Sequence, residues 1–250
     1  MGSIRRAADG AVLAVGFLTV LPVRHRGEPA GLGTAAAWFP LVGALVGAIA
    51  GGVRAGADPL VGASAAAVLA TATLVAITGA LHQDGLADCA DGLGIRGNRG
   101  RRLEVMRDSS IGTFGALALI TWMLLAVTAL AGLDPDAAVR ALVLAGVAGR
   151  WAALLHAVLA APARPDGLGA SFDVGPGALS VATVVSLAAA VLLAGVGHGL
   201  ATVSAVLLLT FTITGWARGT LGGRTGDTLG ATVALTEVAT LLVLLGFATN

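Results

Sequence analysis

The stretch LVGASAAAVLATATLVAITGALHQDGLADCADGLG, residues 60–94, joins an apolar run to a cluster of aspartates. The run Leu60–Leu81 is uncharged and long enough to cross a bilayer as a helix, which takes about 20 residues. Asp84, Asp88 and Asp91 follow it at positions i, i+4 and i+7, which share one face of a helix. Like charges on one face repel each other unless a cation binds them. Hard oxygen donors in this pattern therefore predict a site for Mg²⁺ or Mn²⁺ at the end of a membrane helix.

The composition is typical of an integral membrane protein. Of the 250 residues, 56% are hydrophobic and 12% are charged, and the mean hydropathy is +0.90. A soluble domain carries about 25% charged residues. The 37 glycines suit close packing of transmembrane helices, and the lack of tyrosine disfavours a barrel with aromatic girdles. We therefore expect an all-α, polytopic helical bundle in which residues 1–250 form a single membrane-embedded domain.

Seven apolar runs are long enough to predict transmembrane helices. They are Ala35–Val53, Leu60–Leu81, Ile111–Ala131, Ala137–Ala161, Leu179–Val196, Leu200–Trp216 and Leu229–Phe247. The run Ala11–Leu21 is shorter and ends at Pro22, so residues 1–34 are expected to form an interfacial or half-inserted segment.

The loops between these runs fall into two sets, which seven spans would place on opposite sides of the membrane. One set carries Arg54 and three aspartates, whereas the other is rich in arginine and is expected to face the cytoplasm by the positive-inside rule. Every motif-like polar segment lies in the arginine-rich set, which predicts a single site on that side. The arginines of this set and of the N-terminus are Arg5, Arg6, Arg24, Arg26, Arg96, Arg99, Arg101, Arg102, Arg107, Arg164, Arg218 and Arg224.

The aspartate cluster has a simpler alternative, because Gly85, Gly92 and Gly94 make the segment prone to turns in which aspartates cap helices. The functional interpretation is favoured because unpaired carboxylates at a membrane surface are costly. A second polar segment, residues 101–115, alternates arginines with Glu104 and Asp108. Its arginines are typical either of an ion-paired surface helix or of guanidinium groups that bind phosphate.

Two further segments lie on the same side. Residues 219–230 form a glycine-rich loop whose backbone N–H groups suit an anion, and Asp227 in it is a candidate metal ligand or base. Residues 163–169 contain Arg164 and are typical of a Pro/Gly turn. Arg150 and His156 lie inside an apolar run, so we expect them to face the bundle interior and either reach the site or pair within it.

These segments together resemble the cobalamin synthase family of the bacterial inner membrane, whose members are adenosylcobinamide-GDP ribazoletransferases. The resemblance covers nearly the whole chain in order. Four positions depart from the usual pattern: Cys89 replaces a threonine, Ser110 replaces a frequent basic residue, and Val233-Ala234 replaces a Gln-Glu pair, although Glu237 remains. The segments that carry the resemblance are residues 17–23, 38–43, 82–92, 106–112, 164–169 and 222–231.

The resemblance implies a reaction in which the 5′-hydroxyl of α-ribazole, or of its 5′-phosphate, attacks the phosphate attached to adenosylcobinamide and displaces GMP. Mg²⁺ is the implied cofactor, with Mn²⁺ as the alternative. We expect Asp84, Asp88, Asp91 and Asp108 to be metal ligands, and Asp91 or Asp227 to be the general base. The remaining expected substrate- and phosphate-binding residues are His82, Arg96, Arg102, Glu104, Arg107, Ser109, Arg164, Gly222, Gly223, Arg224 and Gly226.

Two rival interpretations stay open at this point. A CDP-alcohol phosphotransferase uses similar aspartate-rich helices, but Ala87-Asp88 stands here where that family has Ala-Arg. A cation or substrate transporter predicts charges spread through the spans, which here hold few charged side chains. Apart from the two substrates and membrane lipid, no partner is indicated: the sequence predicts no nucleic-acid binding and leaves homo-oligomerisation open.

Overall fold

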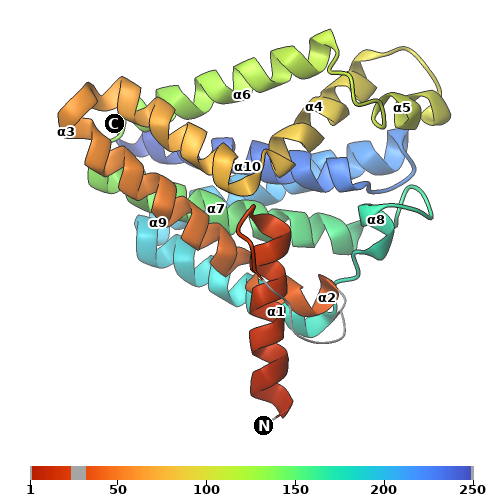
Figure 1. Ribbon diagram of the computed structural model, residues 1–250, viewed down its shortest axis with the longest axis horizontal. Coiled ribbons are helices and arrows are strands. Elements are labelled where there is room, and N and C mark those ends of the chain that lie inside the picture. The colour runs from red at the N-terminus through yellow and green to blue at the C-terminus, as the bar shows by residue number, and fades with distance from the viewer. Residues whose placement is uncertain (1, 24–31, 249–250) are drawn as a thin grey trace.

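The computed structural model describes residues 2–23 and 32–248, and the chain is helical through most of them. Arg24 and Arg26, counted above among the basic loop residues, lie outside the described residues. Figure 1 shows the helices, most of them lying side by side in one bundle. They are α1 (Gly2–Leu18), α2 (Leu32–Ala35), the 3₁₀ helix η1 (Ala36–Trp38), α3 (Phe39–Thr78), α4 (Leu81–Gly94), α5 (Arg99–Val105), α6 (Thr113–Ala131), α7 (Pro135–Leu159), α8 (Leu168–Ser171), α9 (Pro176–Thr220) and α10 (Gly226–Ala248).

The prediction of an all-α, polytopic membrane protein is confirmed. Within the described part of the chain, five helices are long and apolar enough to cross a membrane, namely α3, α6, α7, α9 and α10. Two of these, α3 and α9, are broken at Gly62 (φ 78°) and Gly195 (φ 77°), and Figure 1 shows each one turning back at its break. The five helices therefore contain the seven expected apolar segments.

The two breaks do not lie where the sequence predicted loops. Residues 54–59 were expected to form a connection, but the helix continues through Pro59 as far as the break at Gly62. The connection expected at residues 197–199 is likewise helical, and the turn is made at Gly195. The physical reason is the positive φ of both turns, a conformation that glycine adopts without steric cost and other residues avoid.

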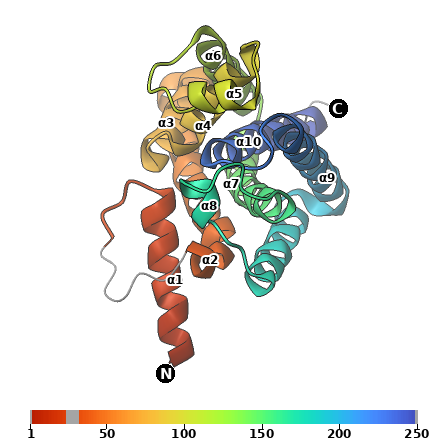
Figure 2. The same ribbon diagram turned by 90° about the vertical axis from the view of Figure 1, so that its right-hand side faces the viewer.

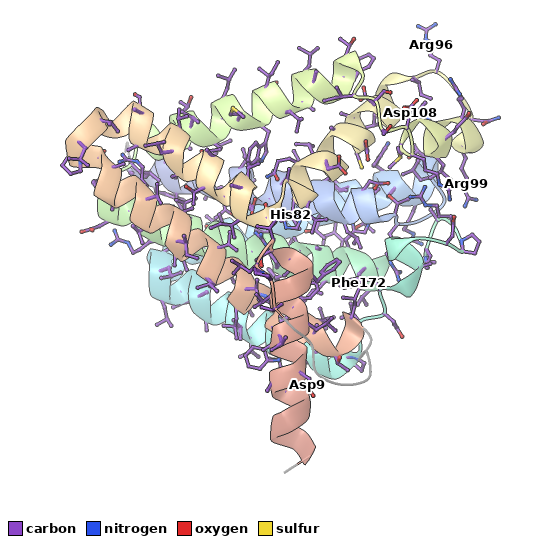
Figure 3. The ribbon with its side chains drawn as sticks, viewed as in Figure 1. Asp9, His82, Arg96, Arg99, Asp108 and Phe172 are labelled. Carbon is purple, nitrogen blue, oxygen red and sulfur yellow. The ribbon has the colours of Figure 1, made fainter. Side chains whose placement is uncertain are left out.

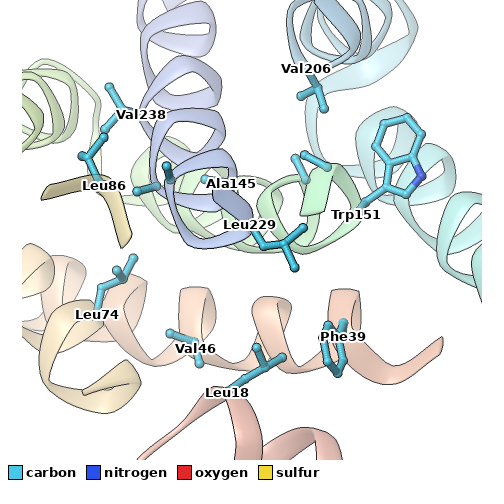
Figure 4. Packing of buried hydrophobic residues seen from close by; sticks show 14 of the residues in the cluster. Leu18, Phe39, Val46, Leu74, Leu86, Ala145, Trp151, Val206, Leu229 and Val238 are labelled. Carbon is cyan, nitrogen blue, oxygen red and sulfur yellow. The ribbon is translucent and has the colours of Figure 1, made fainter. Parts of the chain in front are cut away.

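Helix α7 forms the centre of the bundle. It is the most deeply buried of the five apolar helices, and it packs against α3, α9 and α10. Figure 4 shows side chains from several helices meeting in the apolar cluster around it, among them Leu18 of α1, Leu86 of α4 and Val206 of α9. The contact of α7 with α3 is a backbone contact, because a Cβ atom added to Gly43 would lie 2.1 Å from the carbonyl oxygen of Gly146. Small residues at such crossings let helices in membranes approach closely.

The polar segments gather at one end of the bundle. Figure 1 places α5, α8 and the connection from α9 to α10 at that end, and the breaks of α3 and α9 at the opposite end. Helix α1 runs across the bundle rather than along it, as Figures 1 and 2 show from two directions. The fold thus brings together the loops that the sequence placed on one side of the membrane.

The contact between α3 and α7 predicts a large effect of a single methyl group. Gly43→Ala should lower the free energy of unfolding by about 1–3 kcal/mol, because overpacking forces the two backbones apart. Gly52→Ala, on the same helix, is the matched control, since its Cβ atom would meet nothing within 4 Å. Thermal unfolding of the two variants in detergent measures the difference. Equal melting temperatures would contradict the packing described for α3 and α7.

Candidate active site

The aspartate cluster lies on α4, as its spacing predicted. The helix α3 ends at Gly79, and both Gly79 (φ 60°) and Ala80 (φ 58°) adopt the left-handed conformation immediately before α4 begins. That conformation is uncommon for a residue other than glycine, and strained positions of this kind cluster at functional sites. The turn directs α4 away from α3 and carries its carboxylates toward the polar end of the bundle.

Asp84 and Asp88 line one polar cavity between α4 and the segment that precedes α6. Its empty volume is about 860 Å³. Burial is the main cause that raises the pKa of the Asp88 carboxyl from 3.8 to about 7, although Arg164 opposes the rise. Three neighbouring carboxylates add to the rise, and these are, in decreasing order of effect, Asp227, Asp84 and Asp91. The site therefore concentrates negative charge around Asp88.

Asp227 comes to this cluster from the first turn of α10. Its carboxylate lies 3.6 Å from the guanidinium of Arg164 and accepts a hydrogen bond of 3.1 Å from the Thr225 hydroxyl. The helices α4 and α10 cross closely here, because a Cβ atom on Gly85 would lie 2.7 Å from the Asp227 carbonyl oxygen. Asp227 and Arg164 are thus held beside Asp84 and Asp88 by a backbone contact.

Asp91 is used differently from its two neighbours on α4. One carboxylate oxygen accepts the Gly112 N–H at 2.7 Å, and the other accepts the Gly115 N–H at 2.9 Å. These are the first amides of α6, which have no partner within their own helix. Asp91 therefore fastens the start of α6 to α4, and both of its oxygens are engaged in doing so.

Asp108 reaches the same cavity from the other side. It is exposed, and one oxygen accepts the Ser110 N–H at 2.9 Å, a hydrogen bond that lowers the pKa of the carboxyl. Arg107 and Ser109 line the cavity beside it. Figure 3 shows Asp108 on the segment between α5 and α6. The structure thus brings together five of the expected site residues: Asp84, Asp88, Arg107, Asp108 and Ser109.

The donor set suits a hard divalent cation. Among the described residues, no three His, Cys, Asp or Glu side chains already form a metal-binding group. Mg²⁺ does not require such a cage, because it is usually bound through one or two carboxylates together with substrate phosphates and water. Burial raises the pKa of Asp88 most, and three neighbouring carboxylates add to the rise, so a cation bound here would offset their negative charge. Asp84, Asp88 and Asp227 therefore fit Mg²⁺ in the company of a phosphate-bearing substrate.

Two of the arginines expected to bind phosphate hold the backbone together instead. Arg102 donates to the carbonyls of Gly92 (2.7 Å) and Leu93 (3.0 Å) at the end of α4. The buried Arg224 donates to three carbonyls, those of Ala160, Gly169 and Phe172. These bonds engage all three nitrogens of the Arg224 guanidinium and Nη1 of Arg102.

The remaining charged residues of the segment behave in different ways. Arg107 makes an exposed two-oxygen contact with Asp166, at 2.6 and 2.9 Å. Glu104 pairs with Arg101 at 2.8 Å on the surface, as the ion-paired helix interpretation expected. Arg96 lies at the outer edge of the molecule and points away from it (Figure 3). Arg164 is the expected arginine placed at the carboxylates, and its Nη1 is buried without a hydrogen-bond partner.

The glycine-rich loop packs against the connection that follows α7. The Arg224 N–H donates to the Ala161 carbonyl oxygen at 2.8 Å, and the Ala163 N–H donates to the Arg224 carbonyl oxygen at 2.8 Å. Gly223 has a Cβ position only 2.1 Å from the Ala161 carbonyl oxygen, and Gly222 lies against the Arg99 guanidinium. Gly226 begins α10 next to Asp227. The loop therefore positions α10, and its glycines allow a close backbone approach.

The buried polar groups of the spans pair within the bundle, one of the two outcomes expected for them. The Arg150 guanidinium forms a buried ion pair with Glu237. The two ring nitrogens of His156 contact the hydroxyls of Thr232 (3.0 Å) and Thr228 (3.4 Å). Thr228 is in turn bonded to Thr225, which donates to Asp227. A hydrogen-bond chain thus leads from the core to the site.

The sequence assigned no role to Gln83 or to three phenylalanines of the structure, although Gln83, Phe17 and Phe39 lie in segments that carry the resemblance. Gln83 is buried in the wall of the cavity, and neither of its amide atoms has a partner among the described residues. The ring of Phe39 stacks between two others, with its centroid 5.7 Å from that of Phe17 and 5.5 Å from that of Phe172. They lie far apart along the chain, so no spacing pattern connects them. Burial and the nearby Arg150 lower the pKa of His82, which lies beside this stack, well below its ordinary value.

Comparison with known proteins gives one consistent result. The model of the cobalamin-5-phosphate synthase family matches residues 10–245. An adenosylcobinamide-GDP ribazoletransferase from Bradyrhizobium diazoefficiens is 42% identical over 257 aligned residues, which cover 98% of this chain and 96% of that protein. Relatives of the same name from Roseiflexus sp. and Klebsiella pneumoniae are 40% and 44% identical, over 92% and 83% of this chain and 87% and 85% of their own lengths.

No solved structure matches the chain. The family model spans nearly all of the sequence, and the relatives align over most of their own lengths. The residues described above at α4, α10 and the connections between them all lie inside the matched region. This chain belongs to the cobalamin-5-phosphate synthase family.

Proposed function

We propose that this chain is an Mg²⁺-dependent adenosylcobinamide-GDP ribazoletransferase of the bacterial inner membrane, with its polar end facing the cytoplasm. The observation that carries the proposal is the convergence of Asp84 and Asp88 from α4 with Asp227 from the start of α10 and Arg164 from the connection that follows α7. Such a cluster suits a reaction at a diphosphate, where positioning and charge stabilisation supply most of the catalysis. The names of the relatives supply the substrates, which are adenosylcobinamide-GDP and ribazole.

In the proposed reaction, the 5′-hydroxyl oxygen of α-ribazole or its 5′-phosphate forms a bond to the phosphorus attached to cobinamide. The bond from that phosphorus to the bridging oxygen breaks, and GMP leaves with the electron pair. Mg²⁺ bound at Asp84 and Asp88 would neutralise the charge that gathers on the diphosphate oxygens. Arg164 lies 3.6 Å from Asp227, and its buried Nη1 has no hydrogen-bond partner among the described residues, so it would bind a phosphate oxygen.

The proton of the attacking hydroxyl needs an acceptor, and two candidates were left open by the sequence. Asp91 is poorly suited, because both of its oxygens accept backbone amides of α6. Asp227 is partly exposed, and Thr225 holds one of its oxygens at 3.1 Å. We therefore assign the role of general base to Asp227 and the role of fastening α6 to Asp91.

The direct test of the proposal is GMP release by purified protein in detergent, supplied with adenosylcobinamide-GDP and α-ribazole. GMP should appear in proportion to the cobalamin product and should require both the acceptor and Mg²⁺. Full activity after exhaustive chelation would contradict the metal dependence. Turnover of a CDP-alcohol substrate in place of adenosylcobinamide-GDP would favour the rival phosphotransferase activity.

The metal-ligand assignment predicts the effect of removing single charges. Asp88→Asn and Asp84→Asn should each reduce GMP release by about a hundredfold or more, a typical cost of losing one stabilising group in the transition state. Both variants should unfold at the temperature of the wild type or above it, because they relieve repulsion. Asp136→Asn, an exposed aspartate at the opposite end of the bundle, is the control and should keep full activity. Near-normal GMP release by Asp88→Asn at ordinary Mg²⁺ would remove Asp88 from the site.

The different role of Asp91 predicts a different result for the same substitution. Asp91→Asn should lower the free energy of unfolding by about 1–3 kcal/mol, because an amide leaves one N–H of α6 unpaired. GMP release per folded molecule should fall much less than in Asp88→Asn. Thermal unfolding and activity measured on the same preparation separate the two quantities. An Asp91→Asn protein of unchanged stability that releases no GMP would instead make Asp91 a catalytic residue.

A further inference from the structure

A second cavity lies on the other side of the α4–α10 crossing, and its walls are mostly apolar. Phe17 of α1, Phe39 of α3 and Phe172 after α8 form one side, and Leu229 and Val233 of α10 are among the residues on the other. Figure 3 shows that the labelled His82 and Phe172 lie near the middle of the molecule, where α1 crosses the bundle. An aromatic-lined cavity of this kind suits a planar, apolar ring.

Three buried nitrogens in the wall of this cavity have no hydrogen-bond partner among the described residues. They are Nε2 of His82, whose residue is 3% exposed, and Nε and Nη2 of Arg150, whose residue is 1% exposed. Buried polar atoms without partners are rare and costly. The nitrogens of Arg150 can only donate. A ligand that satisfies this wall must therefore present hydrogen-bond acceptors on an otherwise apolar body.

The cavity approaches the proposed base along α10. Gly226 lines the cavity, and Asp227 is the next residue. On α4, His82 lines this cavity, whereas Asp84, two residues later, lines the polar cavity. A ligand seated between the phenylalanines would therefore reach the proposed base with groups that extend past Gly226.

We propose that this cavity binds the aromatic base of the acceptor nucleoside and that His82 Nε2 donates a hydrogen bond to the unsubstituted nitrogen of its ring. The inference rests on the proposed function, because ribazole is a ribonucleoside of dimethylbenzimidazole. That base is a flat apolar bicycle with two methyl groups and one free acceptor nitrogen, which matches the three phenylalanines and the unpartnered Nε2 of His82. Its ribose then extends past Gly226 and brings the 5′-hydroxyl to Asp227.

The hydrogen bond is tested with a pair of acceptors that differ in one atom. The wild type should have a KM about 10- to 100-fold higher for the α-ribazole analogue in which carbon replaces the free ring nitrogen, because the buried donor is then left unpaired. His82→Leu should raise the KM for α-ribazole to the level of the analogue and leave the KM for adenosylcobinamide-GDP unchanged. His82→Gln, which keeps a donor, should restore part of the difference. A His82→Leu enzyme that still discriminates between the two acceptors would overturn the assignment.

The location of the base is tested by filling the cavity without removing a polar group. Ala153 of α7 lines the cavity, so Ala153→Leu should raise the KM for α-ribazole at least tenfold with little change in kcat. Ala118→Leu is the matched control, because Ala118 lines a separate cavity between α4, α6 and α10. If thermal unfolding shows that both variants are folded, an unchanged KM for α-ribazole in Ala153→Leu would place the base elsewhere.

Equilibrium binding of α-ribazole, measured by calorimetry without the second substrate, separates this inference from the proposed function. Binding that Ala153→Leu weakens and Ala118→Leu does not would support the cavity even if the wild type released no GMP. Release of GMP by the wild type, with binding equal in both variants, would overturn the cavity while the proposed function stands.

Discussion

The close crossing of α4 and α10 is the constraint on which the rest of the site depends. At this crossing the backbone of one helix meets that of the other, with a Cβ position on Gly85 only 2.7 Å from the Asp227 carbonyl oxygen. The contact places carboxylates from residues 84–88 and from residue 227 in one small volume, although the chain between them forms five helices. It also separates the polar cavity from the aromatic cavity. A side chain at the crossing would force apart both the carboxylates and the two cavities.

Three charged side chains that take no part in the proposed reaction hold the elements around this crossing through hydrogen bonds to backbone groups. Asp91 fastens α6 to α4, Arg102 holds the end of α4, and Arg224 ties the start of α10 to the connections beside it. In each case an ionised side chain satisfies backbone groups that helix ends leave without partners. The carboxylates of Asp84, Asp88 and Asp227 remain with less compensation, and the pKa of Asp88 is raised by burial first and by these neighbours second.

Most of the fold was predictable from the sequence, because hydropathy alone identifies helices in a chain this apolar. The helix at Asp84–Asp91 followed from spacing, and the gathering of polar loops at one end followed from the distribution of arginine. The roles of single charged residues were not predictable in the same way. Whether Asp91 binds a ligand or backbone N–H groups depends on where the start of α6 lies, and whether Arg102 binds a ligand or backbone carbonyls depends on where the end of α4 lies. The aromatic cavity draws its phenylalanines from residues 17, 39 and 172, which no local pattern connects.

The proposed function depends above all on the carboxylates of α4 holding a divalent cation against the diphosphate of the donor substrate. Electron paramagnetic resonance of Mn²⁺ added to the purified protein with adenosylcobinamide-GDP tests it most directly. We predict a bound Mn²⁺ signal with coupling to phosphorus, displaced by Mg²⁺ and lost in Asp88→Asn. A bound signal of equal strength and coupling in Asp88→Asn, or no bound Mn²⁺ in the active wild type, would contradict the claim.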